Sequence, residues 1–131
     1  MIKNILLVED NPASHQLMRE AFKEALIETD LTMVDNGNDA LHFLRKEGRF
    51  AASTKPDLVL LDLNLPGKSG IELMEEIKGD PSLQSIPLIV LTGSSAAADI
   101  QACARFHCKY LLKPSRFHEL VQLVKSLPDL I

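Results

Sequence analysis

Five side chains that can bind metal ions or phosphate groups each stand directly after a short apolar run. Glu9 and Asp10 follow the first run, and Asp62, Thr92 and Lys113 follow three later ones. If these residues meet, the carboxylates carry −3 and the lysine returns +1. Like charges about 4 Å apart repel by about 4 kcal/mol at an effective dielectric constant of about 20. The two negative charges that the lysine does not compensate therefore require a shared proton or a divalent cation. Because oxygen ligands favour Mg²⁺, which also binds phosphate oxygens, the residues predict a magnesium site beside a phosphoryl group.

The apolar runs predict the strands of a parallel sheet. They are Ile2–Val8, Leu31–Val34, Leu58–Leu61, Leu88–Leu91 and Tyr110–Leu112. Apolar residues at helical spacing lie between the runs and predict helices around Leu17–Leu26, Ala40–Leu44, Ile71–Ile77, Ala96–Phe106 and Phe117–Leu127. Alternating strands and helices indicate an α/β domain, in which ligands bind at the carboxyl ends of the strands. All five side chains are therefore expected at one edge of the sheet.

Three local signals predict where helices and connections begin and end. Asn11 is expected to cap the first helix, with Pro12 at its first position, where no backbone donor is needed. Gly79 is expected to follow the third helix as a C-terminal glycine. The segment Gly48–Lys55 is an unusually long connection for a fold of this kind.

Length and composition predict one folded domain, spanning residues 1–131, with no output domain. The chain has 131 residues, of which 46% are hydrophobic and 24% charged, enough apolar material for a core. A net charge of −4 argues against a nucleic-acid partner, which usually meets a clustered basic face. No apolar run reaches the roughly 18–20 residues that span a bilayer. Two cysteines are too few for a disulfide scaffold, so we expect a cytoplasmic protein with reduced thiols and no membrane partner.

Four motifs in the chain, in the same order, resemble those of the receiver domain of two-component response regulators. They are ILLVEDNP, LVLLDLNLPGKSG, LIVLTGSS and YLLKP. The resemblance covers nearly the whole chain, and the stretch HFLRKEGRF suggests the group paired with phytochrome-type sensor kinases. It implies a flavodoxin-like, doubly wound, five-stranded parallel sheet in the order 2-1-3-4-5, with helices on both faces.

The resemblance also implies the roles of the acidic residues. Asp62 would be the phosphoacceptor, attacking a phosphohistidine on a sensor histidine kinase or phosphotransfer protein. Mg²⁺ would be bound directly by Asp10, Asp62 and the backbone carbonyl of Asn64, with Glu9 acting through a metal-bound water. The protein would lose the phosphoryl group slowly and would not turn over a separate substrate, so it would not act as an enzyme in the ordinary sense.

The remaining roles concern signalling. By the same resemblance, Lys113 would pair with Asp62 and then with a phosphoryl oxygen, through a cis Lys113–Pro114 peptide bond. Thr92 would donate its hydroxyl to the phosphoryl group, and Tyr110 would be an aromatic switch that fills the space Thr92 vacates. The output would be contact with a downstream protein, and receivers of this kind often form homodimers through the fourth helix, fifth strand and fifth helix. Apolar residues there, including Ile100 and Phe117, fit either a surface patch or the core.

Three other interpretations of the residues carry less weight. A haloacid-dehalogenase-type phosphatase needs a second aspartate two residues after the nucleophile, where this chain has Asn64. A pseudo-receiver that is never phosphorylated would not need the full set of site residues. A zinc site at Cys103, His107 and Cys108 fits no usual ligand spacing and lacks a fourth ligand. The other histidines fall in predicted helices and are expected at the surface; they are His15, His42 and His118.

Overall fold

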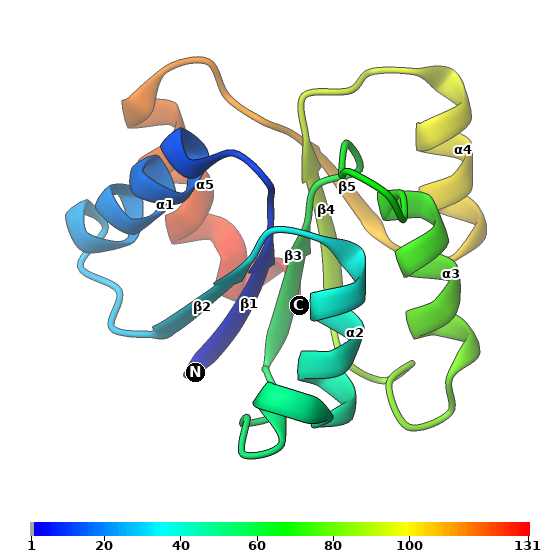
Figure 1. The fold of residues 1–131 in the computed structure, drawn as a ribbon. Coiled ribbons are helices and arrows are strands. Elements are labelled where there is room, and N and C mark those ends of the chain that lie inside the picture. Colours follow the sequence, from blue (N-terminus) through cyan, green and yellow to red (C-terminus); the bar gives the residue numbers. More distant parts are fainter. Residues whose placement is uncertain (1) are drawn as a thin grey trace.

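The computed structural model describes residues 2–131, which form five strands alternating with five α-helices (Figure 1). The strands are β1 (Asn4–Val8), β2 (Asp30–Val34), β3 (Leu58–Leu61), β4 (Leu88–Thr92) and β5 (Lys109–Leu112). The helices are α1 (Pro12–Glu24), α2 (Gly37–Arg45), the short 3₁₀-helix η1 (Gly48–Phe50), α3 (Gly70–Gly79), α4 (Ala97–Arg105) and α5 (Phe117–Leu130). Every element predicted from the sequence is present, so the α/β assignment is confirmed.

The sheet is parallel throughout, with strand order β2-β1-β3-β4-β5. This order confirms the flavodoxin-like topology. The strand order reverses beside β1, where β2 and β3 lie on opposite sides, and such a reversal opens a crevice at the carboxyl ends of the strands. The central strands β3 and β4 are buried along their whole length, which explains their unbroken apolar sequences.

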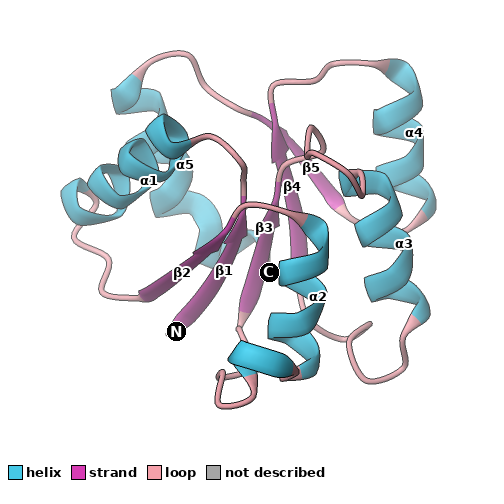
Figure 2. Cartoon of the chain, viewed as in Figure 1, coloured by secondary structure: helices cyan, strands magenta, loops and turns pink. Residues whose placement is uncertain are grey.

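Two hydrophobic cores lie on opposite faces of the sheet. One joins the sheet to α2, α3 and α4, and the other joins it to α1 and α5, as the grouping of helices in Figure 2 shows. Alternation along β1 produces this division, because Leu6 and Val8 belong to the first core while Ile5 and Leu7 belong to the second. The sheet is therefore held rigidly from both sides, and its carboxyl edge is left to position polar groups.

Local capping agrees with the sequence at the start of α1 and differs at the end of α3. The Asn11 side chain accepts a hydrogen bond from the Ala13 N–H at 2.8 Å, with Pro12 as the first helical residue. Gly79 is the last residue of α3 rather than a glycine beyond it, and its φ is not positive. The helix ends instead at Asp80, whose extended backbone terminates the turn. That expectation was wrong because Asp80 and the following proline suffice to stop the helix.

Some residues of the predicted apolar stripes lie at the surface. Leu17 and Phe117 are 45% and 40% exposed, and Leu26 is 90% exposed. Leu26 follows the end of α1 with a φ of +57°, so its side chain leaves the helical face altogether. The apolar stripe of α1 that packs against the core is therefore narrower than the spacing of its apolar residues predicted. No helix within residues 2–131 combines the length and the apolar character needed to cross a bilayer.

The long connection at Gly48–Lys55 is ordered by packing onto α2. It contains η1, whose Phe50 ring meets the Phe43 ring edge-on at 5.5 Å between centroids. The Ser53 hydroxyl donates a 2.8 Å hydrogen bond to the Phe43 carbonyl. This segment lies at the amino-terminal edge of β3, away from the predicted site (Figure 1).

Candidate functional site

The carboxyl ends of four strands bring the predicted site residues to one edge of the sheet. Glu9 follows β1, Asp62 follows β3, Thr92 ends β4 and Lys113 follows β5. Parallel pairing places these ends next to one another, because Val8 lies beside Leu61, and the Lys113 N–H bonds the Thr92 carbonyl at 2.8 Å. The order of strands, more than any local motif, therefore assembles the site.

Asp62 is the most highly coordinated carboxylate at this edge. It is 6% exposed, and its Oδ1 accepts hydrogen bonds from the Thr92 hydroxyl at 2.9 Å and the Asn64 N–H at 3.0 Å. Its Oδ2 accepts a hydrogen bond from the Lys113 ammonium at 3.1 Å. Thr92 is fully buried, so its hydroxyl is held in place by the surrounding protein. The carboxylate is thus fixed in orientation, as a nucleophile must be for in-line attack.

Gly70 allows the chain to reach this arrangement. A Cβ at position 70 would lie 2.4 Å from the Leu63 Cα and 2.7 Å from the Asp62 carbonyl oxygen. The Gly70 N–H instead bonds the Leu63 carbonyl at 3.1 Å. Only glycine lets α3 begin so close to the backbone that carries Asp62.

Glu9 and Lys113 form the second half of the site. Glu9 is 4% exposed; its Oε2 accepts a 2.6 Å hydrogen bond from Lys113, and its Oε1 accepts one from the Asn11 N–H at 3.2 Å. One ammonium therefore serves two buried carboxylates, Glu9 and Asp62. Two buried carboxylates against one ammonium leave one negative charge uncompensated, which is less than the sequence predicts because Asp10 lies outside this network.

Burial and the shared hydrogen bonds shift the pKa values of the two carboxyl groups in opposite directions. Burial, followed by the neighbouring Asp62, raises the pKa of Glu9 to about 7, and Lys113 only partly opposes this. For Asp62, burial acts to raise the pKa. The contacts with Glu9, the Asn64 N–H and Lys113 outweigh that effect and hold the pKa below its ordinary value. Near neutral pH, Glu9 thus retains much of a proton beside an ionised Asp62.

We expect the metal-free protein to lose stability as the pH rises through this range. Glu9 ionises near 4.5 in the unfolded chain and near 7 in the folded one, so the folded state binds more protons between these values. The free energy of unfolding should therefore fall, by about 3 kcal/mol, from about pH 4.5 to above pH 7. Asp62 acts in the opposite sense, because its lowered pKa contributes stability that is lost only below its ordinary value of 3.8.

Urea denaturation without divalent metal, at about pH 5 and about pH 8, measures this decline. In Glu9→Gln, which cannot ionise, the decline should be largely absent. A wild-type protein equally stable at both values would contradict the shifted pKa of Glu9.

Asp10 lies at the edge of this cluster, whereas Asn64 contributes its backbone N–H to it. Both side chains are exposed, and Asp10 does not join the hydrogen-bond network of Asp62. Within residues 2–131, no three His, Cys, Asp or Glu side chains are close enough together to hold a metal ion unaided. The donors present nevertheless fit Mg²⁺, which takes only one or two protein carboxylates beside waters and carbonyl oxygens. Burial is the main cause of the raised pKa of Glu9, and the neighbouring Asp62 adds negative charge that a cation would compensate.

Two details of the sequence-based interpretation are corrected. The Lys113–Pro114 bond is trans, since residues 2–131 contain no cis peptide bond. Lys113 reaches both carboxylates without it, because β5 already ends beside Thr92. His15 is half-buried rather than at the surface, and its Nε2 lies 2.5 Å from the Glu9 carbonyl oxygen. Its helical spacing carried no sign of this contact, whereas His42 and His118 are exposed as expected.

The cysteines form no part of the site. Both are free thiols, and burial raises the pKa of Cys103 to about 11 and raises that of Cys108 as well. Such thiols are poor metal ligands and nucleophiles at neutral pH.

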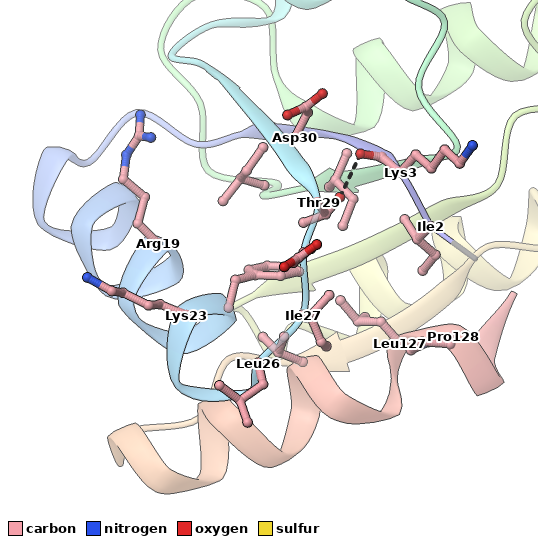
Figure 3. A pocket seen from close by; sticks show the side chains of 15 residues that line it. Ile2, Lys3, Arg19, Lys23, Leu26, Ile27, Thr29, Asp30, Leu127 and Pro128 are labelled. Carbon is pink, nitrogen blue, oxygen red and sulfur yellow. Dashed lines mark hydrogen bonds between the residues drawn. The ribbon is translucent and has the colours of Figure 1, made fainter.

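A large groove lies at the other end of the sheet. It has a volume of about 1250 Å³ and is lined by residues of β1, β2 and the ends of α1 and α5, among them Lys3, Lys23, Asp30 and Leu127 (Figure 3). None of the predicted site residues lines it. Because it opens at the amino-terminal ends of β1 and β2, it is separate from the carboxylate cluster.

Comparisons with known proteins agree with the fold. Residues 5–125 match the model of the response regulator receiver domain. The chain therefore belongs to the response regulator receiver domain family, which is not a family of conventional enzymes.

Several relatives are similar over almost the whole chain. Response regulator Rcp1 of Synechocystis sp. is 40% identical over 95% of this chain and 86% of its own length. Response regulator DivK of Brucella anthropi is 32% identical over 96% of each chain. The crystal structure of the phosphorylated cyanobacterial phytochrome response regulator RcpA is 40% identical, with a TM-score of 0.90 over 98% of this chain and 93% of that one. The Mn²⁺-bound form of Rcp1 is 39% identical, with a TM-score of 0.87 over 97% and 92%.

Proposed function

We propose that this protein is a phosphorelay response regulator that accepts a phosphoryl group on Asp62. The observation that carries the proposal is the buried Asp62 carboxylate, held by Thr92 on one oxygen and Lys113 on the other. In the transfer, an Asp62 carboxylate oxygen forms a bond to phosphorus as the P–N bond of a phosphohistidine breaks. The departing imidazole nitrogen keeps the electron pair. The product is an aspartyl phosphate, which hydrolyses slowly and supports no turnover of a separate substrate.

The protein's own residues prepare this step by positioning and by charge. Lys113 neutralises the phosphoryl oxygens, and the Thr92 hydroxyl turns from Asp62 to one of them. Asp10, Asp62 and the Asn64 carbonyl would hold Mg²⁺, with Glu9 acting through a bound water. When bound, the ion would neutralise developing negative charge on the phosphoryl group. The Mn²⁺-bound form of the relative Rcp1 supports a divalent cation in this role.

Signal output is proposed to begin at Thr92 and Tyr110. Because Thr92 is fully buried, a turn of its hydroxyl toward the phosphoryl group leaves space that the neighbouring aromatic side chain can fill. The two residues lie on adjacent paired strands, with Val90 of β4 beside Tyr110 of β5. Differential contacts with the phosphoryl group would then shift the population between two packings.

The donor is proposed to be a sensor histidine kinase or phosphotransfer protein in the cytoplasm, and the receiver of the signal a downstream protein. The relatives described as phytochrome response regulators support a phytochrome-type kinase. Three exposed apolar side chains lie in this region: Ile100 on α4, Leu112 at the end of β5 and Phe117 at the start of α5. They support a contact surface there, for a target or for a homodimer. The net charge of −4 gives no support to a nucleic-acid partner.

Removal of the divalent metal provides the direct test. Incubation with acetyl phosphate and Mg²⁺ should give a single phosphoryl adduct by intact-mass measurement, and the same incubation with excess EDTA should give little or none. The reason is that the ionised Asp62 carboxylate repels a phosphoryl group whose charge is not neutralised by a cation. Equal adduct formation with and without metal would remove Mg²⁺ from the proposal, and no adduct in either case would refute the function itself.

A further inference from the structure

The backbone carbonyl of Glu9 is held by a side chain of the helix that follows it. His15 lies near the start of α1 and is half-buried, and its Nε2 is 2.5 Å from the Glu9 carbonyl oxygen. A carbonyl oxygen can only accept a hydrogen bond, so the Nε2 atom of His15 carries the hydrogen. Side chains of a helix tilt toward its N-terminus. This tilt lets His15 reach back over the loop that leads from β1 to α1 (Figure 1).

Separate contacts fix the residues on either side of this carbonyl. The Glu9 N–H donates to the Val34 carbonyl at 3.0 Å, and the Glu9 carboxylate accepts a hydrogen bond from Lys113. The Asn11 N–H donates to the Glu9 carboxylate at 3.2 Å, and the Asn11 side chain caps α1. Asp10 therefore lies between two residues that are held in place.

The position of Asp10 depends on the peptide unit that joins it to Glu9. The Asp10 side chain is exposed and stands outside the hydrogen bonds that hold Asp62. Because a peptide bond is planar, the direction of the Glu9 carbonyl determines where the nitrogen and Cα of Asp10 lie. The hydrogen bond from His15 fixes that direction, and with it the point from which the Asp10 side chain starts.

The phosphoacceptor, in contrast, has supports of its own. Asp62 accepts hydrogen bonds from Thr92 and Lys113, neither of which involves α1. Mg²⁺ needs near-ideal octahedral geometry, so a carboxylate that is displaced from its place binds the ion less tightly. Metal binding by Asp10 therefore depends on the backbone that His15 holds, whereas the position of Asp62 does not.

We propose that His15 is a positioning residue for the Mg²⁺ site: its Nε2–H holds the Glu9 carbonyl and thereby places Asp10 for metal binding. This inference rests on the proposed function and adds to it a residue that acts on the backbone of the site. Its effect falls on the affinity for the metal rather than on the transfer of the phosphoryl group, because the contacts of Asp62 do not include His15.

Two substitutions of His15 separate the position of the hydrogen-bond donor from the loss of the ring. The side-chain nitrogen of glutamine lies about as far from the backbone as Nε2 of histidine, whereas that of asparagine lies only about as far as Nδ1. His15→Gln can therefore keep the hydrogen bond to the Glu9 carbonyl, and His15→Asn cannot. His42→Asn, at an exposed position of α2, is the matched control for the cost of asparagine in a helix.

Titration of the metal-free, full-length proteins with Mg²⁺, followed by ¹H–¹⁵N NMR at one fixed pH, measures the dissociation constant of the metal. We expect His15→Asn to bind Mg²⁺ about 10-fold more weakly, which is the lower end of the range for loss of a group that orients a metal ligand. His15→Gln should bind it nearly as tightly as the wild type, and His42→Asn should match the wild type. Before metal is added, the Asp10 amide resonance should move in His15→Asn and stay near its wild-type position in His15→Gln. Both variants should fold, because the ring is only half-buried, and the same spectra show whether they do.

The rate of adduct formation with acetyl phosphate separates placement of the metal from the transfer step. His15→Asn should need about 10-fold more Mg²⁺ for half of its maximal rate, yet should approach the wild-type rate at saturating Mg²⁺. An unchanged Mg²⁺ affinity in His15→Asn, or an equal loss of affinity in His15→Gln, overturns the inference. If the wild type forms its adduct while either of these results is found, the inference fails alone. A wild type that forms no adduct shows instead that the proposed function is wrong.

Discussion

Replacing Asp62 by asparagine is expected to abolish the phosphoryl adduct that forms with acetyl phosphate and Mg²⁺. The amide oxygen of asparagine is a much weaker nucleophile than a carboxylate oxygen, and no other described carboxylate is held by both a hydroxyl and an ammonium group. Intact-mass measurement should show no detectable adduct at a time when the wild type is fully converted. The variant should still fold, since asparagine keeps the size of the side chain and an acceptor for the Thr92 hydroxyl.

A matched control is available in α5. Asp129 is an exposed aspartate far from the strand ends, so Asp129→Asn should form the adduct as the wild type does. The pKa of Glu9 should also fall toward its ordinary value in Asp62→Asn, because the negative charge of Asp62 contributes to raising it. A normal adduct on Asp62→Asn would place the phosphoacceptor elsewhere in the chain.

Loss of the Lys113 ammonium is expected to have the second largest effect. Lys113→Met keeps the aliphatic part of the side chain but leaves Glu9 and Asp62, which are 4% and 6% exposed, without their shared cation. Removing one partner of a buried ion pair costs about 3–5 kcal/mol. Because the Lys113 side chain is itself 28% exposed, we expect a loss near 3 kcal/mol, the lower end of that range, at about pH 8.

The loss of stability in Lys113→Met should be smaller at low pH. The same variant should also be phosphorylated more slowly. At about pH 5 Glu9 is protonated in the folded protein, so less charge is left uncompensated and the destabilisation should be smaller. Without the charged hydrogen bond to the phosphoryl oxygens, the rate of adduct formation should drop by about 10- to 100-fold. Urea denaturation and time-resolved mass measurement report the two effects. Lys125→Met, at an exposed position of α5, is the matched control. If the two variants had the same stability and the same rate of adduct formation, the role assigned to Lys113 would be wrong.

Local sequence patterns were sufficient to predict the helices and strands and most of the residues at the site. The apolar runs before Glu9, Asp62 and Thr92 are buried strands, as predicted, because only a sheet covered on both faces accommodates such sequences. The rule that ligands bind at the carboxyl ends of parallel strands then brought these residues together with Lys113 without coordinates. Two of the three counted carboxylates, those of Glu9 and Asp62, do share the Lys113 ammonium.

Other features depended on distances that sequence spacing does not encode. The spacing of His15 indicated only a helical surface position, whereas its contact with the Glu9 carbonyl arises from the path of the loop between β1 and α1. The exposure of Leu17 and Leu26 depends on where α1 ends and how it lies on the sheet. The trans Lys113–Pro114 bond likewise corrects a feature carried over from the family resemblance.

By itself, the sequence determined the class of fold, the family and the set of residues that meet at the strand ends, because alternation and strand-end chemistry are local properties. Only the tertiary structure decided how those residues share hydrogen bonds and protons. It showed that Lys113 serves two carboxylates at once and that Asp10 stays outside their network. It also showed that Ser94 connects Thr92 to Asp99 through hydrogen bonds. The physical reason is that hydrogen bonds and pKa values depend on differences of a few tenths of an ångström between segments far apart in the chain.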